Sequence, residues 1–345
     1  MAVNMSLNLQ LAAYVTAFYR PMRGRVRNYL VGQSLLLVLL LGSVHGEASA
    51  QQGMEVFATA DYLISAIDQA RQSVASLDDS DGVQGPPSKV WLPLYLSDFP
   101  RSTRNMVYIP PGEFLMGCDN IDSSDYCVQA ELPIHVVYLD GYYIDKYEVT
   151  NYRYELCVKD GGCSLPAQSS SYTRAEYYGT SRYDNYPVIH VNWYQANSFC
   201  KWEGKRLPTE AEWEKAARGS SDTRKFPWGN SDPTCRRTNS RAGDPQYPCY
   251  GDTSAVGSYG AGISPYGVRD MAGNVWEWVS DWYSSDYYSN SPYRNPTGPR
   301  GGSLRIRRGG SWSRYVRHLQ TSHRLAYPAD GAGIHNGFRC AVRLN

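Results

Sequence analysis

The sequence predicts an α+β fold that contains little regular secondary structure and is held together by disulfide bonds. Only three short segments of residues 105–345 have a clear helical pattern. From residue 220 onward, glycine, proline, serine, asparagine and aspartate separate short apolar pieces, which is typical of loops and brief strands. The chain has eight cysteines, an even number, and none of them forms a Cys-x-x-Cys pair. In an exported chain such a set favours disulfide bonds over zinc.

The first fifty residues have the pattern of a secretory signal peptide. Four arginines precede an apolar run at residues 35–41, and the small residues Ala48 and Ala50 predict cleavage after Ala50. The run is too short for a transmembrane helix, which needs about 20 apolar residues. Met22 is an alternative start, and an uncleaved N-terminal anchor is the alternative interpretation. The predicted location is secreted, periplasmic or on the cell surface, with no stable membrane span after cleavage.

Three segments follow the predicted signal. In residues 51–78 apolar side chains recur at three- and four-residue spacing, which predicts a helix. This helix either packs on its own domain or forms a short oligomerisation segment. Residues 79–104 predict a polar linker, and residues 105–345 predict the main domain, whose roughly 240 residues are within the size of one domain.

The net charge of the predicted mature chain is close to zero. Residues 1–50 hold four of the 34 basic residues and one of the 33 acidic ones, so the remainder has a net charge near −2. Nothing in this balance indicates binding to nucleic acid or to a membrane.

The helices of the main domain are predicted from their caps and apolar positions. The first follows Thr150 and covers residues 151–158, just after an extended segment at 142–148, and the second covers 194–202. The third is marked by Thr209 and Glu212 in a capping box and by Gly219 as its end. Short spacing predicts three local disulfide bonds, Cys118–Cys127, Cys157–Cys163 and Cys235–Cys249.

Several separate motifs carry a family resemblance. They are the runs Arg-Leu-Pro-Thr-Glu-Ala-Glu-Trp-Glu at 206–214, Gly-Asn-Val-Trp-Glu-Trp at 273–278, Arg-Gly-Gly-Ser-Trp at 308–312 and Gly-Phe-Arg-Cys at 337–340. Together they resemble the domain of formylglycine-generating enzyme, the sulfatase-modifying factor family, over residues 105–344. The resemblance implies a C-type-lectin-like fold and a long-range disulfide bond between Cys200 and Cys340.

The chain departs from this family at its best-known chemistry. The family has two redox cysteines at the third and eighth positions after the Gly-Gly-Ser serine, where this sequence has Arg314 and Leu319. Formylglycine-generating activity is therefore not expected, and neither copper nor iron is expected as a cofactor. Related sulfoxide synthases need an iron site with spaced histidines, and this chain has six histidines without such a trio.

The resemblance also implies a structural calcium site. The family binds calcium at the positions that match Asp270, Gly273, Val275 and Glu277, where carboxylates and backbone carbonyls supply hard oxygen ligands. Asn239 and Ser240 match a second, weaker site whose acidic partner is missing here, because its position falls near Pro248. The alternative is that Glu277 forms an ion pair with an arginine and holds no metal.

A window without acidic residues suggests a ligand. Residues 287–329 contain eight arginines and no aspartate or glutamate, and arginine binds carboxylate, sulfate and phosphate well. We expect an anionic glycan or protein as the partner, bound on the segment that lines the active site in the family. The predicted ligand-binding residues are Trp312, Arg314, Tyr315, Arg317, His318, His323 and Tyr327. The alternative for Arg308, Arg324 and Arg339 is a buried structural ion pair.

Three functional hypotheses follow. The first is an exported, non-catalytic ligand-binding member of the family, stabilised by calcium and disulfide bonds. The second is an oxidoreductase of the sulfatase-modifying-factor class with altered chemistry. The third is a variable receptor, because similar C-terminal segments are diversified in retroelement-encoded ligand binders. A reverse transcriptase gene and a near-copy of the segment's coding repeat would distinguish the third.

Overall fold

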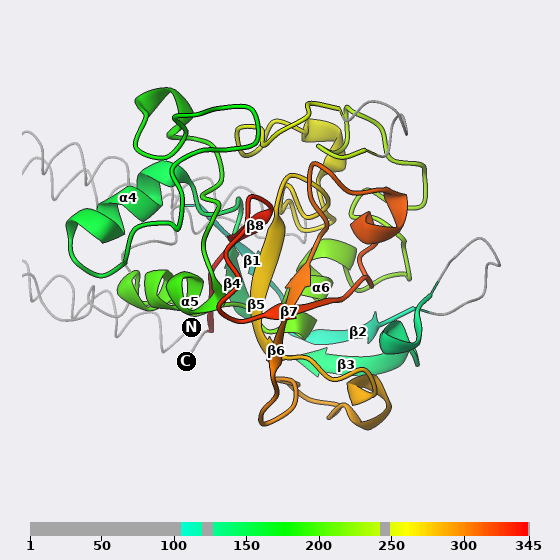
Figure 1. Ribbon diagram of the computed structural model, residues 1–345. Helices are drawn as coiled ribbons and strands as arrows, with labels where there is room; N and C mark the ends of the chain where they lie inside the picture. Colours follow the sequence, from blue (N-terminus) through cyan, green and yellow to red (C-terminus); the bar gives the residue numbers. More distant parts are fainter. Residues whose placement is uncertain (1–104, 119–126, 242–248, 344–345) are drawn as a thin grey trace, which may run out of the picture. The chain divides into compact units, whose positions relative to one another are not determined.

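The structure is a computed structural model (Figure 1) that describes residues 105–118, 127–241 and 249–343. The predicted signal peptide, the helix at 51–78 and the linker lie outside the described residues. Within the described part, none of the helices has the length and apolar character needed to cross a membrane.

The three predicted helices form, and each begins at a capping side chain. The first, α4 (Asn151–Lys159), starts where Thr150 Oγ1 accepts a hydrogen bond from Arg153 N. The second, α5 (Trp193–Trp202), starts one residue earlier than predicted, because Asn192 and Gln195 form a capping box. The third, α6 (Glu210–Arg218), has the predicted Thr209–Glu212 box and ends at Gly219, whose φ of 88° suits glycine.

Within the described residues, nine short strands form three sheets, and together with the helices they confirm the α+β class. In the first sheet β4 lies between β1 and β9, all antiparallel, and the second is the β2–β3 pair. The third sheet has the order β7-β6-β5-β8, with β8 parallel to β5. The strand bounds are β1 Met106–Ile109, β2 Gly112–Met116, β3 His135–Leu139, β4 Tyr142–Asp145, β5 Trp276–Trp282, β6 Leu304–Arg308, β7 Leu325–Pro328, β8 Asn336–Phe338 and β9 Ala341–Arg343.

The four-stranded sheet has two different faces, because side chains alternate along each strand. One face carries Glu277 and Arg308 and packs on α6, whose Trp213 donates a hydrogen bond to Glu277. The other face carries Trp276, Trp278 and Arg307. The strands β5 and β6 lie side by side in Figure 1.

The hydrophobic core lies on both sides of the four-stranded sheet. One cluster of buried side chains joins α6 to β2, β3, β4 and β6. A second joins α4 and α5 to Trp278 and Phe338 of the four-stranded sheet. Every residue of α6 is buried, including its charged ones, which is unusual for a helix with three glutamates.

All four predicted disulfide bonds are present. The pairs Cys118–Cys127, Cys157–Cys163, Cys200–Cys340 and Cys235–Cys249 have Cα–Cα distances of 5.8, 5.3, 5.6 and 5.2 Å. These distances are within the usual range for a disulfide. No free cysteine occurs among the described residues, so the thiols needed for thiol-dependent oxidation are not supplied by this part of the chain.

Candidate functional site

The motif arginines Arg308 and Arg324 are buried in ion pairs with α6. Arg308 contacts Glu210 at 3.2 Å and Glu214 at 2.5 Å, and it also donates to the carbonyls of Thr321 and Ser322. Arg324 donates from Nε and Nη2 to the two oxygens of Glu210, at 2.7 and 2.8 Å. Both arginines therefore have the structural role that was the alternative to ligand binding.

Arg339 is the third structural arginine and belongs to the predicted calcium region. It donates to both oxygens of Glu277, at 2.6 and 2.7 Å, while Trp213 Nε1 donates to one of them at 2.8 Å. The ion pair considered as the alternative for Glu277 is thus formed. A metal bound by Glu277 would have to share an oxygen with one of these donors.

Glu148 joins this group, although no motif indicated it. Its two oxygens accept hydrogen bonds from Asn274 Nδ2 at 2.6 Å and from Val275 N at 3.2 Å. Burial and the charges of Asp270 and Glu277 raise the pKa of Glu148 well above its usual range, and burial raises the pKa of Asp270 to about 6. The place of Glu148 among apolar and aromatic residues, between Tyr147 and Val149, was the signal that sequence reasoning overlooked.

The charge of this cluster fits a divalent cation. Glu148, Asp270 and Glu277 are buried together, and Arg339 is the one guanidinium hydrogen-bonded to any of them. When all three are ionised, Arg339 neutralises one charge and Arg269 acts on Asp270 without a hydrogen bond, so the cluster keeps an excess of negative charge. Calcium would balance this excess, held by Asp270 and the carbonyls of Gly273 and Val275, with Glu148 and Glu277 adding negative charge.

The weaker predicted site at Asn239 and Ser240 is already engaged within the protein. Asn239 Nδ2 donates to the Asp252 carbonyl and to Ser254 Oγ, at 2.8 and 3.0 Å. The Ser240 carbonyl accepts from Cys249 N at 2.9 Å. Asn239 Oδ1 has no partner among the described residues, so it is the remaining free oxygen of the predicted pair.

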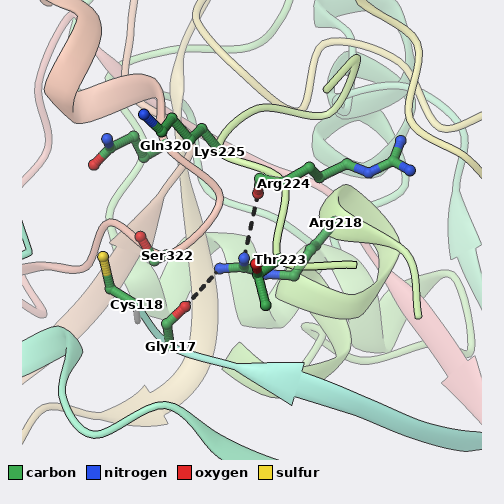
Figure 2. Close-up of a pocket in the computed structure, with 8 residues that line it drawn as sticks. All are labelled: Gly117, Cys118, Arg218, Thr223, Arg224, Lys225, Gln320 and Ser322. Atoms are coloured by element: carbon green, nitrogen blue, oxygen red, sulfur yellow. Dashed lines mark hydrogen bonds between the residues drawn. The ribbon is translucent and has the colours of Figure 1, made fainter. Parts of the chain in front are cut away.

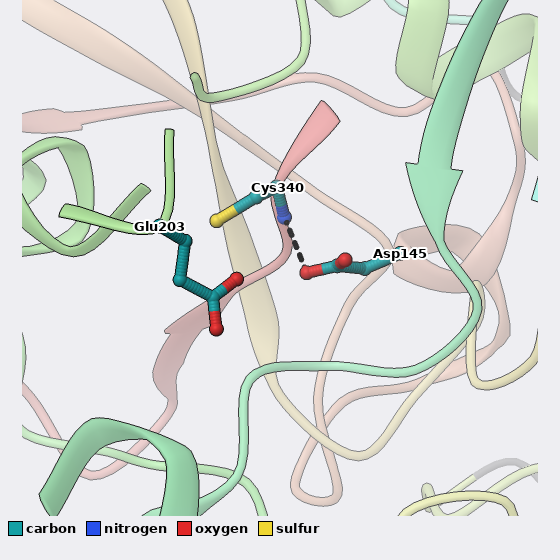
Figure 3. A group of neighbouring side chains, drawn as sticks. All are labelled: Asp145, Glu203 and Cys340. Atoms are coloured by element: carbon teal, nitrogen blue, oxygen red, sulfur yellow. Dashed lines mark hydrogen bonds between the residues drawn. The ribbon is translucent and has the colours of Figure 1, made fainter. Parts of the chain in front are cut away.

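Another group of potential metal ligands is committed to structural contacts (Figure 3). Among the described residues, Asp145, Glu203 and Cys340 are the three acidic, histidine or cysteine side chains whose ligand atoms lie within 4.8 Å of one another. Cys340 is bonded to Cys200, and Arg153 and Lys205 neutralise both carboxylates. This group is therefore an ion-pair network beside a disulfide bond.

Arg314 and Leu319, the two positions that the sequence analysis aligned with the family's redox cysteines, differ in environment. Leu319 is fully buried in a small cluster with Phe226 and Ala272. Arg314 is half-buried, and its Nε has no hydrogen-bond partner among the described residues. One position has thus become part of the core, and the other presents a positive charge.

The predicted ligand-binding residues differ in how far they are exposed to solvent. Tyr315 and Arg317 are exposed, and the Tyr315 hydroxyl accepts a hydrogen bond from Arg241 at 3.3 Å. Trp312 is buried, with its Nε1 unpartnered among the described residues and its ring 4.9 Å from that of His335. His318 and Tyr327 are half-buried.

His323 is placed differently from the others. It is buried, and its Nδ1 lies 2.9 Å from Glu131 Oε1, on the short 3₁₀ turn Gln129–Glu131. This contact ties the segment to the region before β3, so His323 is held by a protein partner. Its ring also lies 4.9 Å from that of His318 and 5.9 Å from that of Trp276.

Arg314 is the centre of a positively charged group. Its charge, after burial and the charge of His323, helps to lower the pKa of His318 to about 4. Burial and then the charges of Arg314 and Arg307 lower the pKa of His335 to about 4 as well. These histidines are therefore neutral at pH 7, and the arginines supply the positive charge. Arg307 and His335 were not among the predicted site residues.

Two cavities of the described region are lined by residues outside this group. One has a volume of about 10 Å³, room for a single water, and lies between the end of β2, the turn at 218–225 and Gln320 (Figure 2). Arg218 crosses it and donates to the carbonyls of Gly117 and Arg224. The other is a hollow of about 580 Å³ beside α5, lined by Asn192, Tyr194 and Asp330 among others.

Comparisons with known proteins are consistent with this architecture. The model of the sulfatase-modifying factor enzyme 1-like domain matches residues 95–344. The chain is 34% identical to a formylglycine-generating enzyme of Streptomyces coelicolor, covering 70% of this chain and 90% of that one. Its structure is similar to that of PvdO from Pseudomonas aeruginosa, with a TM-score of 0.58 and 27% identity over 69% of this chain and 94% of that one.

A second structural likeness bears on the fold alone. Treponema denticola variable protein 1 is 24% identical with a TM-score of 0.55, over 69% of this chain and 95% of that one. Together with PvdO it confirms the C-type-lectin-like arrangement with few helices that the motifs implied.

Proposed function

The chain belongs to the family of sulfatase-modifying factor enzyme 1-like domains, and from that premise we propose that it is an exported, non-catalytic member that binds an acidic ligand. The ligand is an anionic glycan or protein, and its binding surface is the segment from Trp312 to Tyr327. The observation that carries the proposal is Arg314. It stands at a position where the family has a redox cysteine, and it lies among donors that have no carboxylate partner.

The distribution of charge supports this surface over the rest of the molecule. Elsewhere in the window without acids, Arg308 and Arg324 are neutralised by glutamates of α6. Neither Arg314 nor Arg317 forms an ion pair among the described residues. Uncompensated cations beside the unpaired Trp312 N–H are typical of a surface that receives an anion.

Binding should depend on the outward arginines of this surface. Arg314→Ala and Arg317→Ala are expected to weaken binding of the best ligand from a glycan and peptide array. The loss would be about 1.5–3 kcal/mol for a desolvated contact and about 1 kcal/mol or less for an exposed one. Raising the salt concentration should weaken binding further, because the attraction between charges is screened. Affinity is measured by titration calorimetry, with melting temperature measured in parallel.

Arg300→Ala is the matched control, since Arg300 is exposed in the same window but precedes β6. Equal affinity of Arg314→Ala, Arg317→Ala and Arg300→Ala for the ligand would contradict the proposed binding surface. Oxygen consumption with thiol peptides, or an aldehyde product above the blank, would instead favour the oxidoreductase with altered chemistry.

Calcium is proposed as a structural ion at the Asp270–Glu277 cluster. The excess of buried carboxylates motivates this assignment. A chelator should then lower the melting temperature by several degrees, because a ligand at about a hundredfold its dissociation constant contributes roughly 2.7 kcal/mol. Asp270→Asn should reduce the effect of the chelator, whereas Asp330→Asn, at an exposed position, should leave it unchanged. Identical melting with and without chelator, and no metal by elemental analysis, would contradict the assignment.

A further inference from the structure

Two buried arginines differ from the others in having no acidic partner. Six arginines are buried within the described ranges, and four of them, Arg218, Arg308, Arg324 and Arg339, are in ion pairs with glutamates. The remaining two, Arg305 and Arg307, lie on one face of β6 and have no carboxylate within ion-pair distance in the described part of the chain. A buried cation without a counter-ion is costly, so each needs an explanation.

Arg305 is explained by stacking. Its guanidinium lies between the rings of Trp193 and Trp282, 3.7 and 3.4 Å from their centroids, and Nη1 donates to the Ser280 carbonyl. Both faces of the cation are covered by aromatic rings, which stabilise it by cation–π attraction. We assign this residue a packing role.

Arg307 is explained only in part by its contacts. One face lies 3.6 Å from the ring centroid of Tyr327, and Nη1 donates to Asn336 Oδ1. Its Nε is buried and has no acceptor among the described residues, and Nη2 makes no hydrogen bond there either. The edge of the guanidinium formed by Nε and Nη2 is therefore open, and two parallel N–H groups on one edge match the two oxygens of a carboxylate.

The surroundings of Arg307 add positive charge and leave it near the surface. Burial and the charge of Arg314 lower its pKa to about 9, against the opposing effect of Tyr327. Arg314, His335 and Tyr327 are half-buried, so residues beside Arg307 reach the solvent. His335 and Trp312, with an unpartnered Nδ1 and Nε1 among the described residues, lie beside each other.

We propose that Arg307 is the buried anchor for a carboxylate group of the ligand, which its Nε and Nη2 bind side-on while Tyr327 covers one face of the guanidinium. This assignment rests on the proposed function, because it names the chemical group recognised at the same surface. A carboxylate is favoured over phosphate or sulfate because a single planar edge is open, with Asn336 on the next edge and Tyr327 on the face. The ligand is thus an acidic sugar or an acidic peptide side chain or terminus.

The proposal is tested by nuclear magnetic resonance of the arginine Nε–H groups in the purified protein. The Arg307 signal is identified by its loss in Arg307→Met. It should shift saturably on titration with sodium acetate and not with the neutral ester methyl acetate. The Arg339 signal is the internal control, because its Nε already donates to Glu277 at 2.6 Å. Shifts of both signals to the same extent, or no shift at Arg307, would overturn the assignment.

A larger response to phosphate or sulfate than to acetate at equal ionic strength would also overturn the choice of carboxylate. Against the array ligand, Arg307→Met and Arg307→Lys should each lose about 10- to 100-fold in affinity, since lysine keeps the charge without the planar fork. The melting temperature of Arg307→Met should fall much less than that of Arg308→Met, because no carboxylate is left unpaired and the variant loses only the contacts with Asn336 and Tyr327. A fall comparable to that of Arg308→Met would show a structural role instead.

The two proposals fail in different ways. If acetate shifts the Arg307 signal while Arg314→Ala and Arg317→Ala bind the array ligand normally, the carboxylate site stands and the proposed binding surface does not. If those alanine variants lose affinity while Arg307→Met and the acetate titration show no effect, the surface stands and the anchor does not.

Discussion

Replacing both Cys200 and Cys340 with alanine is expected to lower the free energy of unfolding by about 5 kcal/mol, since a bridge closing a loop of this length restricts the unfolded chain strongly. The two cysteines are 140 residues apart, fully buried, and join the end of α5 to the strand β9 region. The loss would exceed half the stability of many domains. Denaturant unfolding under non-reducing conditions measures it.

The bridge Cys157–Cys163 provides the matched control. It closes a separation of only six residues, so its removal should cost about 2 kcal/mol by the same reasoning. Equal losses for the two double variants would show that loop length does not govern the effect and that packing around each sulfur does.

Arg308→Met is expected to destabilise the domain by about 3–5 kcal/mol, because it removes one of the two arginines paired with each of the buried Glu210 and Glu214 and leaves Arg324 and Arg218 to neutralise them alone. Arg308 is fully buried and contacts Glu210, Glu214 and two backbone carbonyls. Methionine fills a similar volume, so the loss reports the broken ion pairs more than a cavity. Thermal and denaturant unfolding measure the change.

The companion variant Glu214→Gln distinguishes this cause from lost packing. Removing a charge from each side of the pair should cost less than the sum of the two single changes, as in any double-mutant cycle of contacting residues. Strict additivity of Arg308→Met and Glu214→Gln would mean that the two side chains do not stabilise each other.

The parts of the fold that sequence reasoning predicted are those set by local signals. Thr209, Glu212 and Gly219 fix α6 through contacts within one turn, and all three act as expected. The start of α5 was missed by one residue because the Asn192–Gln195 capping box was not noticed. The long bridge Cys200–Cys340 came from family resemblance alone, since nothing local connects residues so far apart.

The ion-pair partners of the charged residues could not be predicted from the sequence. An ion pair was considered for Arg308 and Arg324, but residues 287–329 contain no acid and nothing in the sequence identified their glutamates, which are about a hundred positions earlier. The contact between His323 and Glu131 spans 192 positions. Only the tertiary structure shows that Arg307, next to the ion-paired Arg308 on β6, has no acidic partner among the described residues.

The burial of α6 has a consequence for how the chain reaches its final state during synthesis. Glu210 leaves the ribosome roughly a hundred residues before Arg308 and Arg324, the arginines that neutralise it, and Cys200 leaves 140 residues before its partner. A charged helix cannot enter a dry interior until its counter-ions arrive. The order of synthesis therefore makes the C-terminal segment the step that completes the core, and until then Cys200 is exposed to wrong pairing with earlier thiols such as Cys157 and Cys163.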